Sequence, residues 1–206
     1  MVTIDEGYIK YRSFWTQAPI PNAAAADELE IWRQPLLAAG LIGHYDEPGI
    51  GYGNISIRSG EPGQFLISGT QTGHVENTDK THYALVTSYN THANIVCSVG
   101  PVQASSEAMT HAAIYELDSN IGAIVHGHSY VLWKSLVSKL PTTDADVAYG
   151  TPQMADEFRR LYRDTAFRET GLAVMAGHEA GILSFGTTLE EAAGKILGLL
   201  QPAAGA

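Results

Sequence analysis

The order of its strand-like segments is the feature that most constrains the fold of this chain. Short apolar runs first come in pairs joined by turn residues, and only later alternate with helical segments. The expected strands cover residues 54–58, 64–67, 83–89, 95–99, 121–125, 172–176 and 181–185. Neighbouring paired runs are typical of antiparallel hairpins. We therefore expect an α/β domain with a central, mostly antiparallel sheet and helices on both faces.

Caps and apolar stripes mark the expected helices. The first helix is predicted from Ala23 to Ala39, with Pro35 kinking it or shifting its start. Ser105 and Ser106 are suited to cap a helix that runs to about Leu117. The remaining helices are expected over residues 130–140, from Thr151 and Pro152 onward, and after a capping box at residues 187–190.

The 206 residues suit one domain preceded by a short arm. Residues 1–22 are interpreted as an N-terminal arm, and residues 23–206 as a single domain. The aromatic residues of the arm are Tyr8, Tyr11, Phe14 and Trp15. Aromatic side chains on an arm usually pack against something, so we expect the arm to contact a neighbouring subunit.

Composition and charge exclude several classes of protein. The net charge is −10, whereas nucleic-acid binding needs a basic face, so no nucleic-acid partner is expected. No apolar run reaches the roughly 18 residues of a membrane helix, and residues 1–10 lack the apolar core of a signal peptide. Cys97 is the only cysteine and cannot form an internal disulfide. These features predict a cytoplasmic protein with no membrane partner.

Three histidines carry the pattern of a metal site. His126 and His128 lie two residues apart at the end of an expected strand, so their side chains point to the same face. His178 lies between two later strands. Three imidazoles at the strand ends of one sheet form a facial nitrogen site with open positions, which is typical of a catalytic metal. Each histidine taken alone is also consistent with an ordinary polar side chain.

Glu107 is the candidate acid/base residue, because it lies in the expected first turn of the helix behind Ser105 and Ser106. It is equally suited to complement the positive end of the helix dipole. His111 lies one turn later on the same face, either to orient Glu107 or as a histidine of the helix surface. Two histidines with Glu107 would alternatively form a facial triad of the kind that binds iron.

Small hydroxyl-bearing residues and glycines indicate a cradle for an anion. A Gly-rich loop is expected over residues 47–53, and a second loop over residues 68–73. The candidate substrate-binding residues are Asn54, Ser68, Thr70, Thr72, Gly73, Ser105 and Ser106. The same residue types are common in turns, so composition alone does not separate binding from turn formation.

Taken in chain order, these motifs make the sequence resemble the class II aldolase/adducin family. The matching segments are Gly53-Asn54-Ile55-Ser56, Ile67-Ser68 through Thr72-Gly73, Ser105-Ser106-Glu107 with His111, Val125-His126-Gly127-His128, and His178. The resemblance implies a three-layer α/β/α sandwich with a central, mostly antiparallel sheet. It also implies a cyclic homotetramer with active sites between subunits.

The resemblance assigns a role to each motif. It implies that His126, His128 and His178 bind a divalent metal ion, with zinc expected first and manganese, iron or cobalt as alternatives. It implies that Glu107 is the acid/base residue and that the cradle holds a substrate phosphate. The implied protein is a metal-dependent aldolase-type lyase. Such an enzyme cleaves or forms a C–C bond in a small phosphorylated hydroxy-ketone (a sugar phosphate) through an enediolate.

Departures from the family pattern leave the reaction open. Glu179 and Ala180 separate His178 from Gly181, whereas the family usually places glycine directly after this histidine. Residues 128–150 form a short stretch without a match for the family's proton-donating tyrosine. The alternatives are an epimerase, dehydratase or decarboxylase on the same metal core, and a non-catalytic adducin-like assembly domain.

Overall fold

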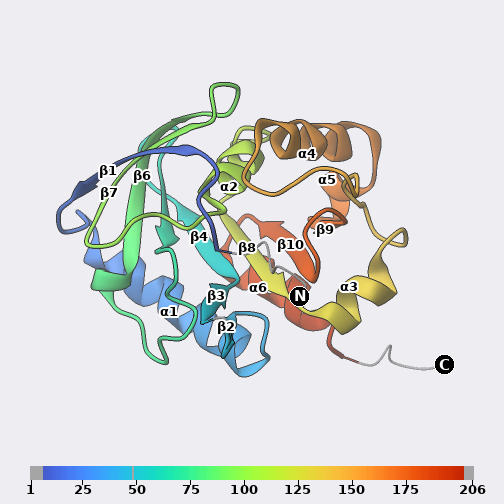
Figure 1. The fold of residues 1–206 in the computed structure, drawn as a ribbon, viewed down its shortest axis with the longest axis horizontal. Helices are drawn as coiled ribbons and strands as arrows, with labels where there is room; N and C mark the ends of the chain where they lie inside the picture. Colours follow the sequence, from blue (N-terminus) through green and yellow to red (C-terminus); the bar gives the residue numbers. More distant parts are fainter. Residues whose placement is uncertain (1–6, 48, 202–206) are drawn as a thin grey trace.

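An eight-stranded sheet forms the centre of the computed structural model, which describes residues 7–47 and 49–201 (Figure 1). The strand order is β1-β7-β6-β5-β4-β8-β10-β9. The strands are β1 (Arg12–Gln17), β4 (Asn54–Arg58), β5 (Phe65–Ser68), β6 (Tyr83–Asn90), β7 (Ile95–Gly100), β8 (Ala123–His128), β9 (Leu172–Val174) and β10 (Gly181–Gly186). Every neighbouring pair in this described sheet is antiparallel except β1 with β7. The predicted mostly antiparallel central sheet is thus confirmed.

Helices cover both faces of the sheet, as the resemblance implied (Figure 1). The helices are α1 (Ala23–Ala38), α2 (Ala108–Tyr115), α3 (Tyr130–Leu136), α4 (Pro152–Asp164), α5 (Phe167–Thr170) and α6 (Leu189–Gly198), with a short 3₁₀ helix at Lys80–His82. α1 and α6 pack on one face, and α2 and α4 pack on the other. Within the described ranges, none of these helices combines the length and the apolar character needed to cross a membrane.

Strand β8 shows how the two faces acquire different roles. Its side chains alternate between the faces because successive residues of a strand point in opposite directions. Val125 packs in the cluster formed with α1 and α6, whereas Ile124 packs in the cluster formed with α2 and α4. His126 lies two residues after Ile124, so its side chain points to the same face of the sheet, toward α2. The site is thus placed between the C-terminal end of β8 and the beginning of α2.

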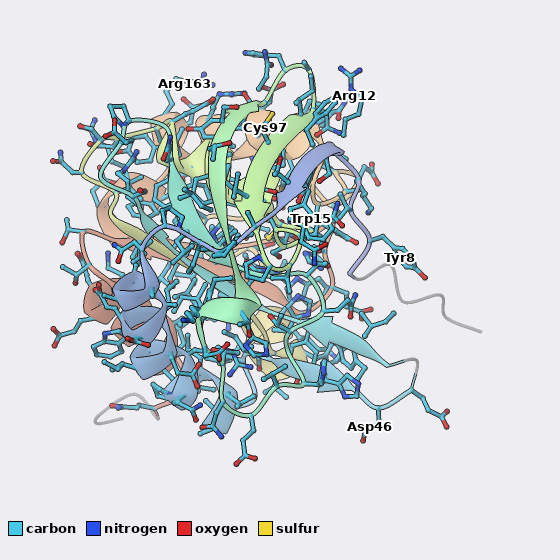
Figure 2. The ribbon with its side chains drawn as sticks, turned by 90° about the vertical axis from the view of Figure 1, so that its left-hand side faces the viewer. Tyr8, Arg12, Trp15, Asp46, Cys97 and Arg163 are labelled. Carbon is cyan, nitrogen blue, oxygen red and sulfur yellow. The ribbon has the colours of Figure 1, made fainter. Side chains whose placement is uncertain are left out.

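The N-terminal segment contributes the first strand of the sheet. β1 pairs in parallel with β7, with Arg12 opposite Ile95. Just before the strand, Tyr11 is buried in the core, and its hydroxyl donates to the carbonyl oxygen of Ser105 at 2.9 Å. The Phe14 side chain is 60% exposed, and Figure 2 shows Tyr8 projecting from the surface near the start of the strand. The aromatic residues of residues 1–22 therefore divide between the core and the surface.

Local structure differs from the expectation at two places, whereas α1 agrees with it. The Gly-rich segment expected as a loop is part of a hairpin of β2 (Gly43–Tyr45) and β3 (Ile50–Tyr52), and Figure 2 shows Asp46 projecting beyond β2. α1 begins at Ala23 as predicted and continues past Pro35 to Ala38. The last helix is capped by Thr188, one residue later than predicted, and its hydroxyl accepts from the Glu191 N–H.

Candidate metal centre and substrate pocket

Three buried histidines meet at the end of β8. His126 and His128 extend from the same face of the strand, and their Nε2 atoms lie 3.0 Å apart. His178 comes from the connection between β9 and β10, and its ring centroid lies 5.1 Å from that of His126 and 4.8 Å from that of His128. One nitrogen from each ring lies within 4.8 Å of the others. The structure thus brings together the three residues that the sequence singled out as ligands.

Two glycines lie within this cluster, at positions where a side chain would be crowded. A Cβ atom on Gly127 would lie 3.0 Å from Ile196 Cδ1 and 3.2 Å from Leu41 Cβ, so a side chain there would press on the opposite core. Gly181 pairs with His128 across the sheet, and a Cβ atom on it would lie 3.1 Å from the His126 ring. The glycine that the family pattern places directly after the third histidine is displaced here by Glu179 and Ala180. Gly181 nevertheless leaves the space that the rings need.

The donor set fits a divalent cation. Two nitrogen ligands at the usual 2.0–2.1 Å from a tetrahedral zinc ion lie about 3.3 Å apart, close to the 3.0 Å between the two Nε2 atoms. Burial lowers the pKa of His128 well below its ordinary value, and the neighbouring His178 and His126 add to this effect. A neutral imidazole is the form that binds a metal. Three imidazole nitrogens suit zinc as well as manganese, iron or cobalt, so the set does not select the metal.

Aromatic residues that the sequence analysis did not assign surround the histidines. The Tyr45 hydroxyl lies 3.4 Å from His128 Nδ1, which leaves Nε2 of that ring as the nitrogen nearest His126. Tyr149 is buried, and its ring stacks on His178 with centroids 4.5 Å apart. No local sequence signal marks either tyrosine as a neighbour of the centre, because both contacts depend on how loops fold over the sheet.

Glu107 is the carboxylate of the centre. It is the N-cap residue of α2 rather than a residue of the first turn, and its side chain is 1% exposed. Its Oε1 lies 3.1 Å from His178 Nδ1. Burial alone would raise the pKa of Glu107, but the interaction with His178 and the charges of His126 and His178 outweigh burial and lower it. Glu107 is therefore ionised at neutral pH, as a proton acceptor must be.

His111 lies inside the molecule rather than on the helix surface. Its Nδ1 is 2.7 Å from the Ser56 hydroxyl, which is 2.8 Å from the hydroxyl of Tyr115. Burial is the main cause that lowers the pKa of His111 to about 3, partly opposed by the Glu107 carboxylate. The His111 side chain thus bonds to a serine of β4, whereas the sequence suggested that it orients Glu107.

Most of the predicted substrate-binding residues line one narrow pocket beside the histidines. They are Asn54, Thr70, Thr72, Gly73, Ser105 and Ser106, and the wall also includes Gln71, Gly7, Gly51, Gly53 and Gly69. Ser68 is not part of this wall, because its hydroxyl accepts the Ile55 N–H at 3.2 Å. The buried Asn54 Oδ1 has no hydrogen-bond partner among the described residues. The residues that line this pocket therefore carry no charged side chain.

Tyr11, one of the aromatic residues of the arm, contacts its own chain beside the pocket. Its hydroxyl donates to the carbonyl oxygens of Ala104 and Ser105, and burial raises its pKa far above the ordinary tyrosine value. Tyr11 therefore stabilises the Ser105 loop by hydrogen bonds to its backbone, and its hydroxyl is poorly suited to donate a proton to a substrate.

A mixed α/β sandwich with a buried three-histidine centre and an adjacent carboxylate is the arrangement of a metal-dependent class II aldolase. The chain belongs to the class II aldolase and adducin family, since the model of the class II aldolase and adducin N-terminal domain matches residues 41–201. The resemblance seen in the motifs is thus confirmed. No curated protein sequence matches the chain significantly.

Solved structures share this fold at low sequence identity. An L-fuculose 1-phosphate aldolase is 18% identical, with a TM-score of 0.63 and coverage of 87% of this chain and 84% of the other. The L-fuculose-1-phosphate aldolase from Thermus thermophilus is 21% identical, with a TM-score of 0.56 and coverage of 86% and 90%. YgbL from Klebsiella pneumoniae, a putative aldolase/epimerase/decarboxylase, is 18% identical, with a TM-score of 0.62 and coverage of 85% and 84%. These likenesses concern the fold.

Proposed function

We propose that this chain is a metal-dependent lyase of the aldolase type. Its substrate would be a small phosphorylated hydroxy-ketone in which it cleaves or forms a C–C bond. The observation that carries the proposal is the meeting of three buried imidazoles with an ionised carboxylate, 3.1 Å from one of them, beside a pocket of neutral donors. An assembly domain without catalysis would not need to bury such a set, because buried ionisable groups are costly to desolvate.

His126, His128 and His178 would hold the divalent cation, for which zinc is the first candidate. When bound, such a cation polarises the carbonyl and hydroxyl oxygens of a substrate and stabilises the negative charge that develops on them. The three rings are held by the packing of β8 and β10, so their positions need little reorganisation. Tyr45 would fix the orientation of the His128 ring through Nδ1.

Glu107 would move the proton. Its carboxylate lies at the N-terminus of α2, close enough to the histidines to reach a substrate bound there. In the cleavage direction it would accept a proton from the substrate hydroxyl whose carbon becomes a carbonyl. In the condensation direction it would return that proton. A buried carboxylate that stays ionised at neutral pH is suited to this task, since it accepts a proton without first losing one.

The pocket formed by Asn54, Gly73, Ser105 and Ser106 would hold the phosphate. Backbone N–H groups and hydroxyls bind phosphate without needing a lysine or arginine, which suits a chain whose net charge is −10. We propose in addition that the protein is a cytoplasmic homotetramer, with a neighbouring subunit supplying the second acid.

A panel of sugar phosphates with identified products tests the reaction. We expect two carbonyl fragments from the active substrate; an epimer, a dehydrated product or released CO₂ would instead establish one of the alternative reactions. Glu107→Gln should keep its metal and lose at least ~100-fold in rate, a typical contribution of a general base. Glu116→Gln, at the other end of α2, is the matched control and should keep its rate. A fully active Glu107→Gln variant would remove Glu107 from the reaction.

A further inference from the structure

A buried arginine of α1 holds the loop that forms one wall of the pocket. Arg33 is 1% exposed, and its guanidinium donates to three carbonyl oxygens of that loop. The acceptors are Val75 at 2.5 Å, Thr72 at 3.2 Å and Glu76 at 3.4 Å. The planar fork of a guanidinium can serve several acceptors at once, which a lysine ammonium does with poorer geometry.

Neighbouring residues of α1 complete this contact. Glu30 lies 3.7 Å from Arg33 and accepts the Thr78 N–H at 3.0 Å, while Gln34 donates to the Glu76 carbonyl at 2.7 Å. These three side chains lie at positions i, i+3 and i+4 and therefore share one face of the helix. Glu30 also compensates the buried charge of Arg33. One face of α1 thus fixes the segment from Thr72 to Thr78 along its length.

The contact with Thr72 determines where the next N–H points. In a trans peptide the C=O and the following N–H lie in one plane and point in opposite directions. Because the Thr72 carbonyl points toward Arg33, the Gly73 N–H points away from it. Thr72, Gly73 and Gly51 all line the pocket. A Cβ atom placed on Gly51 would lie 3.1 Å from the Gly73 nitrogen, so the two residues face each other closely. A Cβ on Gly73 itself would lie 1.9 Å from the Gly43 carbonyl oxygen, so the loop is also confined from the opposite side.

We propose that Arg33 is a positioning residue for the anion-binding pocket. It touches neither the metal ligands nor the pocket interior. It acts by holding the Thr72–Gly73 peptide so that the Gly73 N–H faces the bound phosphate. This inference rests on the proposed function, since it gives Arg33 a role in binding the phosphate of the substrate.

Arg33→Lys is the test variant, because lysine keeps the charge and removes the fork. Arg58→Lys is the matched control: Arg58 also donates to three carbonyl oxygens, those of Ile121, Tyr115 and Asp118, but it lies at the far end of β4 from Asn54. Binding of inorganic phosphate to the metal-loaded protein is measured by calorimetry. Hydrogen exchange of residues 70–78 and metal content are measured on the same samples.

Arg33→Lys should bind phosphate about tenfold more weakly, the effect of losing one charge-assisted hydrogen bond to the loop. Exchange in residues 70–78 should become faster, and metal content should stay unchanged. The KM of the phosphorylated substrate should rise by the same factor with kcat within about twofold, since the reacting groups are not moved. Arg58→Lys should leave phosphate affinity and exchange in residues 70–78 unchanged, even where it lowers the stability of the protein.

The paired variant Glu30→Gln/Arg33→Gln removes both charges together and leaves no uncompensated buried charge. It should show the same loss of phosphate affinity, so the inference remains testable when Arg33→Lys folds poorly. Equal phosphate affinity in wild type, Arg33→Lys and the paired variant overturns the inference. Equal losses in Arg33→Lys and Arg58→Lys overturn it too, because they reflect general destabilisation. Wild type that binds no phosphate refutes the proposed phosphate subsite, and the inference falls with it.

Discussion

His111 is a buried side chain through which acid should destabilise the fold. It is completely buried between α2 and β4, and its Nδ1 lies 2.7 Å from the Ser56 hydroxyl. The informative perturbation is His111→Asn, because an asparagine amide occupies about the position of Nδ1. The variant therefore retains a hydrogen-bonding group toward Ser56 and loses the titratable ring.

The magnitude follows from the difference between the folded and unfolded pKa of His111. The pKa falls from its ordinary value of 6.5 to about 3 in the folded protein, with burial as the main cause. Between these values the unfolded chain binds a proton that the folded chain does not, so stability is lost as the pH falls below 6.5. At pH 5 the loss amounts to 1.5 pH units at 1.36 kcal/mol each, or about 2 kcal/mol.

Urea unfolding at pH 7.5 and pH 5.0 measures this loss in both proteins. The unfolding free energy of wild type should fall by about 2 kcal/mol more than that of His111→Asn between the two pH values. The other titratable groups, including the metal-binding histidines, are common to both proteins and largely cancel in this difference. An equal pH dependence of the two proteins would refute the assignment of His111 as a buried neutral residue.

Three further predictions concern the metal, the last helix and assembly. Elemental analysis should find about one divalent ion per chain in wild type and much less in His126→Ala and His128→Ala; equal and negligible metal in all three after metal-replete growth would remove the metal centre. Glu191 has its pKa lowered to about 2, first by Lys195 and then by Thr187, so its contribution to stability is present above pH 4.5 and lost as the pH falls toward 2. The unfolding free energy of Glu191→Gln should therefore fall less than that of wild type over this pH range, and the difference should be below ~1 kcal/mol because the side chain is exposed. A larger fall in the variant than in wild type would contradict this. Sedimentation should show a species well above 22.1 kDa that Phe14→Ser weakens, and a clean monomer with full activity would contradict both the assembly and a site shared between subunits.

Features that depend on local periodicity could be predicted from the sequence. The alternation of a strand places His126 and His128 on one face whatever surrounds them. Thr151 followed by Pro152 predicts the start of α4, and the structure confirms that the Thr151 hydroxyl accepts the Met154 N–H. These signals act within a few residues, so they are readable without knowing what lies nearby.

Boundaries with several competing local signals could be predicted only approximately. Ser105 and Ser106 are both preferred helix caps, but the structure makes Glu107 the N-cap of α2. The Ser105 hydroxyl instead accepts the Glu107 N–H at 3.2 Å. Tyr11, which lies just before β1 and 94 residues away, donates to the Ser105 carbonyl, and no local signal predicts this contact.

The contacts that complete the candidate site were decided by the tertiary structure alone. β1 joins the sheet beside β7 in parallel, which brings Arg12 opposite Ile95. Arg33 reaches Val75 across 42 residues, and His111 reaches Ser56 across 55. Such partners are selected by the order of strands in the sheet and by which helix packs on which face. The sequence could therefore predict that His126 and His128 point the same way, but not which distant residues would surround them.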